Sequence, residues 1–299
     1  MKIKNSKDSL SLSKLIPVSF ISVILFSVLR SVQLAKLIDS ETGFFIGGNA
    51  FNTVFYVLLA AVCFVFVVYS FLSSQGAKIE LAAFKDNNAG LAAALFAVGL
   101  FYDCGDSLVE GASIFYNIPT HAFLDGADAF KALMSTGALP YIFEGIFAFL
   151  SAIYVIILAK SFSKGSLSAH NHKFIAIAPI AWAGFKMITR FVKQISYIRV
   201  SDLFLELMML ACMILFFVAL SQVISGVYCD DSRWRITALG FSAGILALCI
   251  NIPRFIFTFV AKELINIEYP FNVADAFFGI FAIFVAVAAV KSAADKKIQ

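Results

Sequence analysis

The chain consists of long apolar runs separated by short polar breaks. The breaks carry turn-forming or charged residues, as in "DSETG" at 39–43 and "CDDSRWR" at 229–235. A helix crosses a bilayer with about 20 apolar residues. Eight runs reach this length, and their approximate ranges are 15–38, 50–73, 89–112, 138–160, 174–197, 202–225, 235–262 and 271–291.

The runs are continuous, whereas the strands of a membrane β-barrel would alternate apolar and polar positions over about 10 residues. The pattern therefore predicts an all-α fold, a polytopic membrane helix bundle of about eight transmembrane helices. Eight runs of this length leave little chain outside the membrane. We expect the protein to be surrounded by the lipid bilayer over most of its surface.

Composition and segment lengths set the domain boundaries. Hydrophobic residues make up 61% of the 299 residues and charged residues 14%, whereas a soluble domain is about half apolar and a quarter charged. We expect a cytoplasmic N-terminal tail at 1–14, a single transmembrane domain at 15–291 and a cytoplasmic C-terminal tail at 292–299. The longest connection, about 113–137, has room for a short external helix. The first apolar run has no small-residue cleavage site after it, which favours a retained span over a signal peptide.

Lysine and arginine are unevenly distributed over the loops. They are concentrated in the N-terminal tail, in the second, fourth and sixth loops and in the C-terminal tail. Cytoplasmic loops carry such an excess, so both termini are expected in the cytoplasm. The chain has no N-x-S/T glycosylation sequon. These features favour a multi-pass protein of a bacterial cytoplasmic (inner) membrane.

A weak internal repeat accompanies the spans. The first, fifth and seventh runs each carry an arginine past their midpoint, in "FSVLRSV", "KMITRFV" and "INIPRFI". The following run then has Asn52, Glu206 or Asp275 near its start. Four repeated hairpins would explain this pattern, and internal repeats are common in transporter folds. Chance similarity among apolar helices is the alternative.

Ionisable residues inside the spans fall at one depth when the chain is threaded in this way. Arginines lie late in the outward-running spans, and carboxylates lie early in the inward-running ones. A charge at mid-membrane costs about 2.5–3.5 kcal/mol on insertion scales, so these groups must pair with one another or meet water. The candidate substrate- or ion-binding residues of this outer layer are Arg30, Asp103, Asp106, Glu110, Glu144, Lys186, Arg190, Glu206, Arg254 and Asp275.

Two of the spans carry charge stripes of opposite sign. At about 100° per residue, Asp103, Asp106 and Glu110 fall within an arc of about 60°. The fifth span carries its basic residues at i, i+4 and i+7, namely Lys186, Arg190 and Lys193. We expect the third and fifth spans to face each other, directly or across an aqueous pocket. The outermost charges, Glu110, Lys193 and Asp202, could instead lie at the interface in water.

Known catalytic and metal-binding motifs are missing from the sequence. There is no HExxH, GxSxG or Walker-type loop. Both aspartates of "YDCGD" at 102–106 lie on one helix, whereas an acid dyad needs two carboxyls that converge on one proton. The five cysteines are scattered, without paired spacing. No metal, cofactor or catalytic residue is expected, and an enzyme would require titratable groups that converge from different helices.

Two functions fit these observations. The first is a permease-like or solute-binding protein whose outer polar layer takes a small charged solute or a proton. It predicts a water-accessible cavity that contains Arg190, Arg254 and the Asp103 stripe. The alternative is an accessory, structural or sensor subunit of a membrane complex, bound to a membrane partner subunit, with the charges paired and dry. The net charge of +4 is ordinary for a membrane protein and does not indicate nucleic-acid binding.

Overall fold

The computed structural model describes residues 12–38, 45–46, 50–74, 85–118, 126–165, 172–192, 200–226, 232–261 and 271–295. This part of the chain is helical, with one isolated bridge between Ile38 and Phe45 outside the helices. Its helices are α1 (Leu15–Lys36), α2 (Ala50–Ser74), α3 (Asn87–Tyr116), α4 (Gly126–Ser135), α5 (Ala138–Lys164), α6 (Ala178–Val192), α7 (Val200–Ile224), α8 (Ser232–Val260) and α9 (Val273–Asp295). The prediction of an all-α membrane bundle is confirmed.

Seven of these helices are long and apolar enough to cross a bilayer: α1, α2, α3, α5, α7, α8 and α9. The remaining predicted span, 174–197, corresponds to the 3-10 turn Ile175–Ile177 followed by α6. Helix α6 has 15 residues, about 22 Å at 1.5 Å per residue, which is short of a hydrocarbon core of about 30 Å. Residues 193–199 lie outside the described part of the chain.

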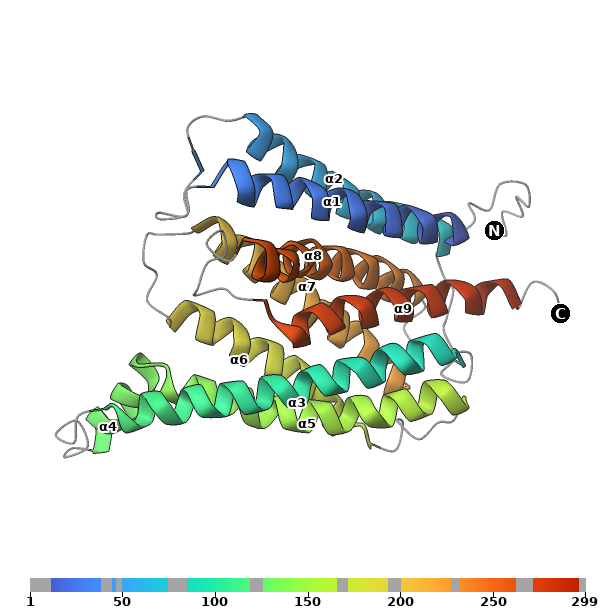
Figure 1. The fold of residues 1–299 in the computed structure, drawn as a ribbon. Helices are drawn as coiled ribbons and strands as arrows, with labels where there is room; N and C mark the ends of the chain where they lie inside the picture. Colours follow the sequence, from blue (N-terminus) through green and yellow to red (C-terminus); the bar gives the residue numbers. More distant parts are fainter. Residues whose placement is uncertain are drawn as a thin grey trace.

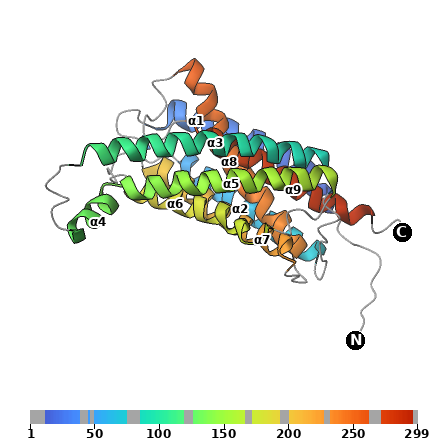
Figure 2. The same cartoon turned by 90° about the horizontal axis from the view of Figure 1, so that it is seen from below.

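The helices run alternately in opposite directions, and α1 begins at the same end of the bundle at which α9 ends (Figure 1). Helices α3 and α5 lie side by side along their length (Figures 1 and 2), and α1 and α2 lie on the opposite side of the bundle (Figure 1). Helices α7, α8 and α9 lie between these two pairs. Helix α8 packs against α1, α2, α7 and α9 and is buried on all sides from Gly240 to Asn251. It is the central helix of the core.

Small residues let the helices around α8 approach closely. A Cβ atom added at Gly244 would lie 2.5 Å from Ile283 Cγ1 and 2.9 Å from the carbonyl oxygen of Gly279, both on α9. A side chain therefore cannot enter without moving α9. Gly240 and Gly244 of "GFSAG" have the small-xxx-small spacing, which allows this close contact between α8 and α9.

The connection between α3 and α5 contains the short helix α4, as the sequence predicted for 113–137. The hairpins differ in their packing. Helices α3 and α5 pair closely, as do α8 and α9, whereas α1 and α2 each pack mainly on α8 rather than on each other. The four-hairpin repeat therefore stays a prediction, as do the domain boundaries at 1–14, 15–291 and 292–299.

Candidate functional site

Charged side chains are buried at one level of the bundle. The bases lie late in α1, α6 and α8, and the acids lie early in α5, α7 and α9, with one acid midway along α3. Because the helices alternate in direction, these positions fall toward the same end of the bundle. Asp202 and Asp275 lie in the first turns of α7 and α9, and Arg190 lies in the last turn of α6, where the helix dipole favours these signs of charge. The buried residues are Arg30, Asp103, Glu144, Lys186, Asp202, Glu206, Arg254 and Asp275, and Arg190 of the same level is 13% exposed.

The first of two ion-pair clusters is centred on Lys186 of α6. Its Nζ atom lies 2.8 Å from Asp275 Oδ1 of α9 and 3.1 Å from Asp103 Oδ1 of α3. Asp103 also accepts hydrogen bonds from Trp182 Nε1 at 2.7 Å and from Asn272 Nδ2 at 2.9 Å. Three donors thus hold the Asp103 carboxylate, and the cluster joins α3, α6 and α9.

The second cluster contains three arginines and two carboxylates. Glu206 of α7 pairs with Arg254 of α8. It also pairs with Arg190 of α6, whose Nε atom lies 3.0 Å from Glu206 Oε2. Asp202 of α7 pairs with Arg30 of α1 and lies 3.6 Å from Arg254 Nη2. The cluster therefore joins α1, α6, α7 and α8.

A neutral hydrogen-bond chain extends the second cluster to α2. Arg30 Nη1 donates to Gln33 Oε1 at 2.9 Å. Gln33 Nε2 in turn donates to Asn52 Oδ1 of α2 at 3.1 Å. Buried amides in such a chain satisfy one another, which removes the cost of leaving polar groups unpaired in an apolar interior.

Helix α6 connects the two clusters. Lys186 of the first cluster and Arg190 of the second lie one helical turn apart on α6. Trp182 lies one turn before Lys186 on the same face, is fully buried and packs against Phe96 of α3, with ring centroids 5.8 Å apart. The short helix is thus held in the bundle by one charged and aromatic face.

Glu144 of α5 belongs to the same layer but not to either cluster. It is 4% exposed, and its Oε2 atom lies 2.7 Å from Thr189 Oγ1 of α6. Among the residues that the structure describes, Glu144 makes no ion pair. It is therefore the buried acid of the layer that has a hydroxyl group, rather than a base, as its polar neighbour.

Two predicted members of the acidic stripe lie elsewhere. Asp106 is exposed on α3, so the expectation that it faces inward with Asp103 is wrong, and the exposed Glu110 fits the alternative of an interfacial position. The neighbouring helices cover the side of α3 that carries Asp103 and Ser107, and Asp106 lies off this side. Glu110 lies on the last part of α3, most of whose residues are exposed. The facing of α3 and α6 is confirmed by the contacts of Asp103 with Lys186 and Trp182, whereas Arg190 pairs with Glu206 of α7 instead. The predicted Lys193 lies outside the described residues.

Sequence reasoning missed several members of the network. Asp202 was not among the candidate site residues, and an interfacial position in water was left open for it, but it is 6% exposed and pairs with two arginines. Its spacing of i, i+4 from Glu206 puts both carboxylates on one face of α7, and this signal was available in the sequence. Trp182 and Thr189 gave no signal, because an aromatic residue and a threonine are ordinary in a membrane helix.

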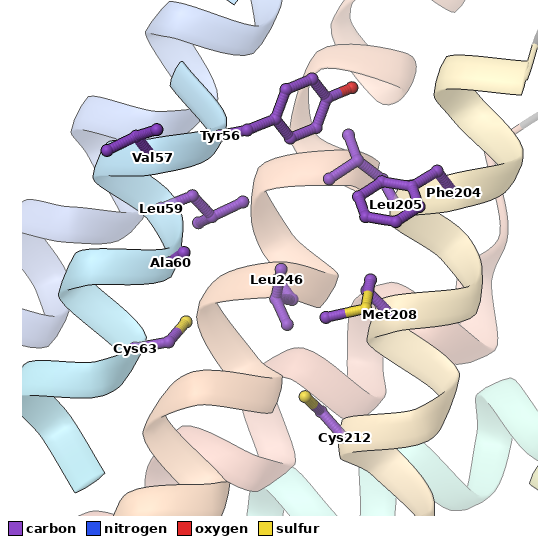
Figure 3. Close-up of a pocket in the computed structure, with 10 residues that line it drawn as sticks. All are labelled: Tyr56, Val57, Leu59, Ala60, Cys63, Phe204, Leu205, Met208, Cys212 and Leu246. Atoms are coloured by element: carbon purple, nitrogen blue, oxygen red, sulfur yellow. The ribbon is translucent and has the colours of Figure 1, made fainter. Parts of the chain in front are cut away.

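A cavity of about 340 Å³ lies between α2 and α7, with one side chain of α8 between them (Figure 3). Its lining is almost wholly apolar, and none of the lining residues belongs to the ion-pair clusters. It suits an apolar group, and it is not the aqueous cavity that the solute hypothesis predicts around Arg190, Arg254 and Asp103. The lining residues are Tyr56, Val57, Leu59, Ala60, Cys63, Phe204, Leu205, Met208, Cys212 and Leu246.

The described residues contain no group of three or more His, Cys, Asp or Glu side chains that could hold a metal ion. The carboxylates of the two clusters are occupied by lysine and arginine instead. Comparison with protein-family models, curated proteins and solved structures finds no match for this chain.

Proposed function

We propose that this integral membrane protein is permease-like, and that the ion-pair network is the closed state of a pathway for a small charged solute or a proton. The observation that carries the proposal is the convergence of nine ionisable groups, eight of them buried and Arg190 partly buried, from seven helices at one level. One or two pairs would be enough to hold helices in register. Ionisable groups inside membrane bundles are costly and usually mark substrate or ion pathways.

A second candidate is favoured by a specific observation. Each of the four bases of the layer has a carboxylate partner, and none of them lines the apolar cavity. A static network of this kind would suit an accessory, structural or sensor subunit that binds a membrane partner. The two candidates differ in whether water ever enters the layer.

Water access can be tested at Ser107, which is 4% exposed and lies one helical turn after Asp103 on α3. A Ser107→Cys variant, in a background without the five native cysteines, is treated with a charged thiol reagent that cannot cross the membrane. A permease that opens exposes the thiol intermittently, so slow labelling is expected. Absence of labelling in the folded protein would favour the static network.

Two controls frame this measurement. Tyr116→Cys, at a position 87% exposed at the end of α3, reports the labelling rate of an open site. Ala183→Cys, at a fully buried position of α6, reports the rate in the closed core. The Ser107→Cys rate is expected between the two, and it should change when the solute or the pH changes.

The proposal includes a bacterial cytoplasmic membrane as the location, with both termini inside. Its support is the excess of lysine and arginine in the tails and in alternate loops. The chain carries no nucleotide-binding loop. Transport would therefore be passive, coupled to an ion, or driven by a partner subunit.

A further inference from the structure

The hydroxyl group of Thr189 lies between two oxygen atoms. Its Oγ1 atom is 2.7 Å from Glu144 Oε2 and 2.8 Å from the backbone carbonyl oxygen of Lys186. A hydroxyl group has one proton to donate, and a backbone carbonyl can only accept. If Glu144 were ionised, two acceptors would compete for this proton, and one of the two short contacts would join two acceptors.

Protonation of Glu144 satisfies both contacts. The carboxylic acid then donates to Thr189 Oγ1, and Thr189 donates its own proton to the carbonyl of Lys186. Donation from a helical hydroxyl to a carbonyl three or four residues earlier is ordinary. This chain does so at Ser19, Ser221 and Ser292, each toward the carbonyl three residues before it.

The charge count of the layer leads to the same conclusion. Within the described part of the chain, the ion-pair clusters contain four bases, namely Arg30, Lys186, Arg190 and Arg254, and four acids, namely Asp103, Asp202, Glu206 and Asp275. They are therefore neutral without Glu144. An ionised Glu144 would add an unpaired charge to an interior where unpaired charges are expensive.

The elements packed against α5 bring few charges to Glu144. Helix α3 contributes Asp103, and α6 contributes Lys186 and Arg190. Among the described side chains of helix α4, the charged one is Lys131, which is exposed. Asp103 is repelled by an ionised Glu144, while the two bases would be drawn to it and away from their partners on α9 and α7.

We propose that Glu144 is the proton-binding site of the network, protonated in the closed arrangement and exchanging its proton with water when the layer opens. Loss of the proton makes Glu144 a competitor for Lys186 and Arg190, which hold α6 to α9 and α7. Proton release thereby loosens α6 from its neighbours, and proton uptake restores the closed pairs. The exchange step rests on the proposed permease-like function, whereas the protonated state does not.

Infrared spectroscopy of the purified protein in lipid tests the protonated state directly. A protonated carboxyl has a C=O stretching band apart from the carboxylate bands, and this band shifts in heavy water. The wild type is expected to show such a band at neutral pH, and Glu144→Gln is expected to lose it. Asp106→Asn, which changes an exposed carboxyl of the same region, should leave the band intact. An identical spectrum in wild type and Glu144→Gln would overturn the proposal.

Two conservative variants keep the test decisive if Glu144→Gln does not fold. Glu144→Asp retains an acid, so its band should move rather than vanish. Thr189→Val retains Glu144 but removes the hydroxyl acceptor, so the band should shift toward that of a carboxyl without a hydrogen bond. If the band has the same position in both variants as in the wild type, it belongs to another group, and the role of Glu144 is refuted.

Labelling of Ser107→Cys separates this proposal from the proposed function. The labelling rate of Ser107→Cys is divided by that of the exposed Tyr116→Cys control at the same pH, because thiolate formation itself depends on pH. If the layer opens and Glu144 controls it, this ratio depends on pH in the parent and not in Glu144→Gln. If the infrared band depends on Glu144 but Ser107→Cys is not labelled, the protonated state of Glu144 is supported and the permease-like function is rejected. Labelling with the same pH dependence in both backgrounds would reject the exchange step while leaving the permease.

Discussion

The Nζ atom of Lys186 lies 2.8 Å from Asp275 Oδ1, across 89 residues of sequence. Lys186 also forms an ion pair with Asp103, so the Lys186 cluster has one positive and two negative charges. The arginine cluster has three positive and two negative charges. The two imbalances are opposite, and Lys186 and Arg190 lie one turn apart on α6. Helix α6 therefore joins two clusters that compensate each other.

Removal of the lysine leaves both of its carboxylates without a base. Lys186→Ala is expected to destabilise the protein by about 3–5 kcal/mol, the cost of breaking a buried ion pair from one side. The additional change Asp275→Asn removes one stranded charge and should recover part of this loss. Unfolding in mixed detergent micelles titrated with SDS measures both. Equal stability of wild type and Lys186→Ala would contradict the buried pair.

Arg190 is expected to couple to Glu206 and not to Asp103. A double-mutant cycle of Arg190→Ala and Glu206→Gln should show a coupling energy of about 0.5–3 kcal/mol, as for residues in one network. The matched cycle of Arg190→Ala with Asp103→Asn should be close to additive, because Asp103 pairs with Lys186. The same SDS titration serves for both cycles. The reverse result would mean that α6 is rotated relative to the structure.

Packing between α8 and α9 depends on Gly244. Gly244→Ala is expected to destabilise the protein by about 1–3 kcal/mol, since overpacking forces neighbouring atoms to move. Gly184→Ala is the matched control, because a Cβ atom there has no other heavy atom within 4 Å. In a helix it should be neutral or slightly stabilising. Equal effects of the two substitutions would show that α8 and α9 are further apart than described.

Reporter fusions test the orientation. A reporter placed after residue 168 and a second one at the C-terminus are both expected on the cytoplasmic side, because the tails and this loop carry the basic excess. A third reporter in the loop between the first two spans, near residue 42, should lie on the opposite side. A periplasmic signal from either of the first two positions would overturn the threading.

Local sequence determined the helices, because a long apolar run in a bilayer has to form its hydrogen bonds within itself. It also determined the depth of the charges, since position along a span gives position across the membrane. Asp103, Glu144 and Arg254 were identified as members of one layer on this basis. The position of α4 in the longest connection was likewise readable.

Only the tertiary structure decided which charge pairs with which. Arg190 lies beside Glu206 rather than the Asp103 stripe, Asp202 is buried, and Asp106 is exposed. These outcomes depend on which helices are neighbours and how each is rotated about its axis. Both are set by packing between segments far apart in the sequence, which the apolar pattern of a single span does not encode. The proposed protonation of Glu144 also depends on the tertiary structure, because it rests on the contact with Thr189 of a neighbouring helix, whose hydroxyl group has a single proton to donate.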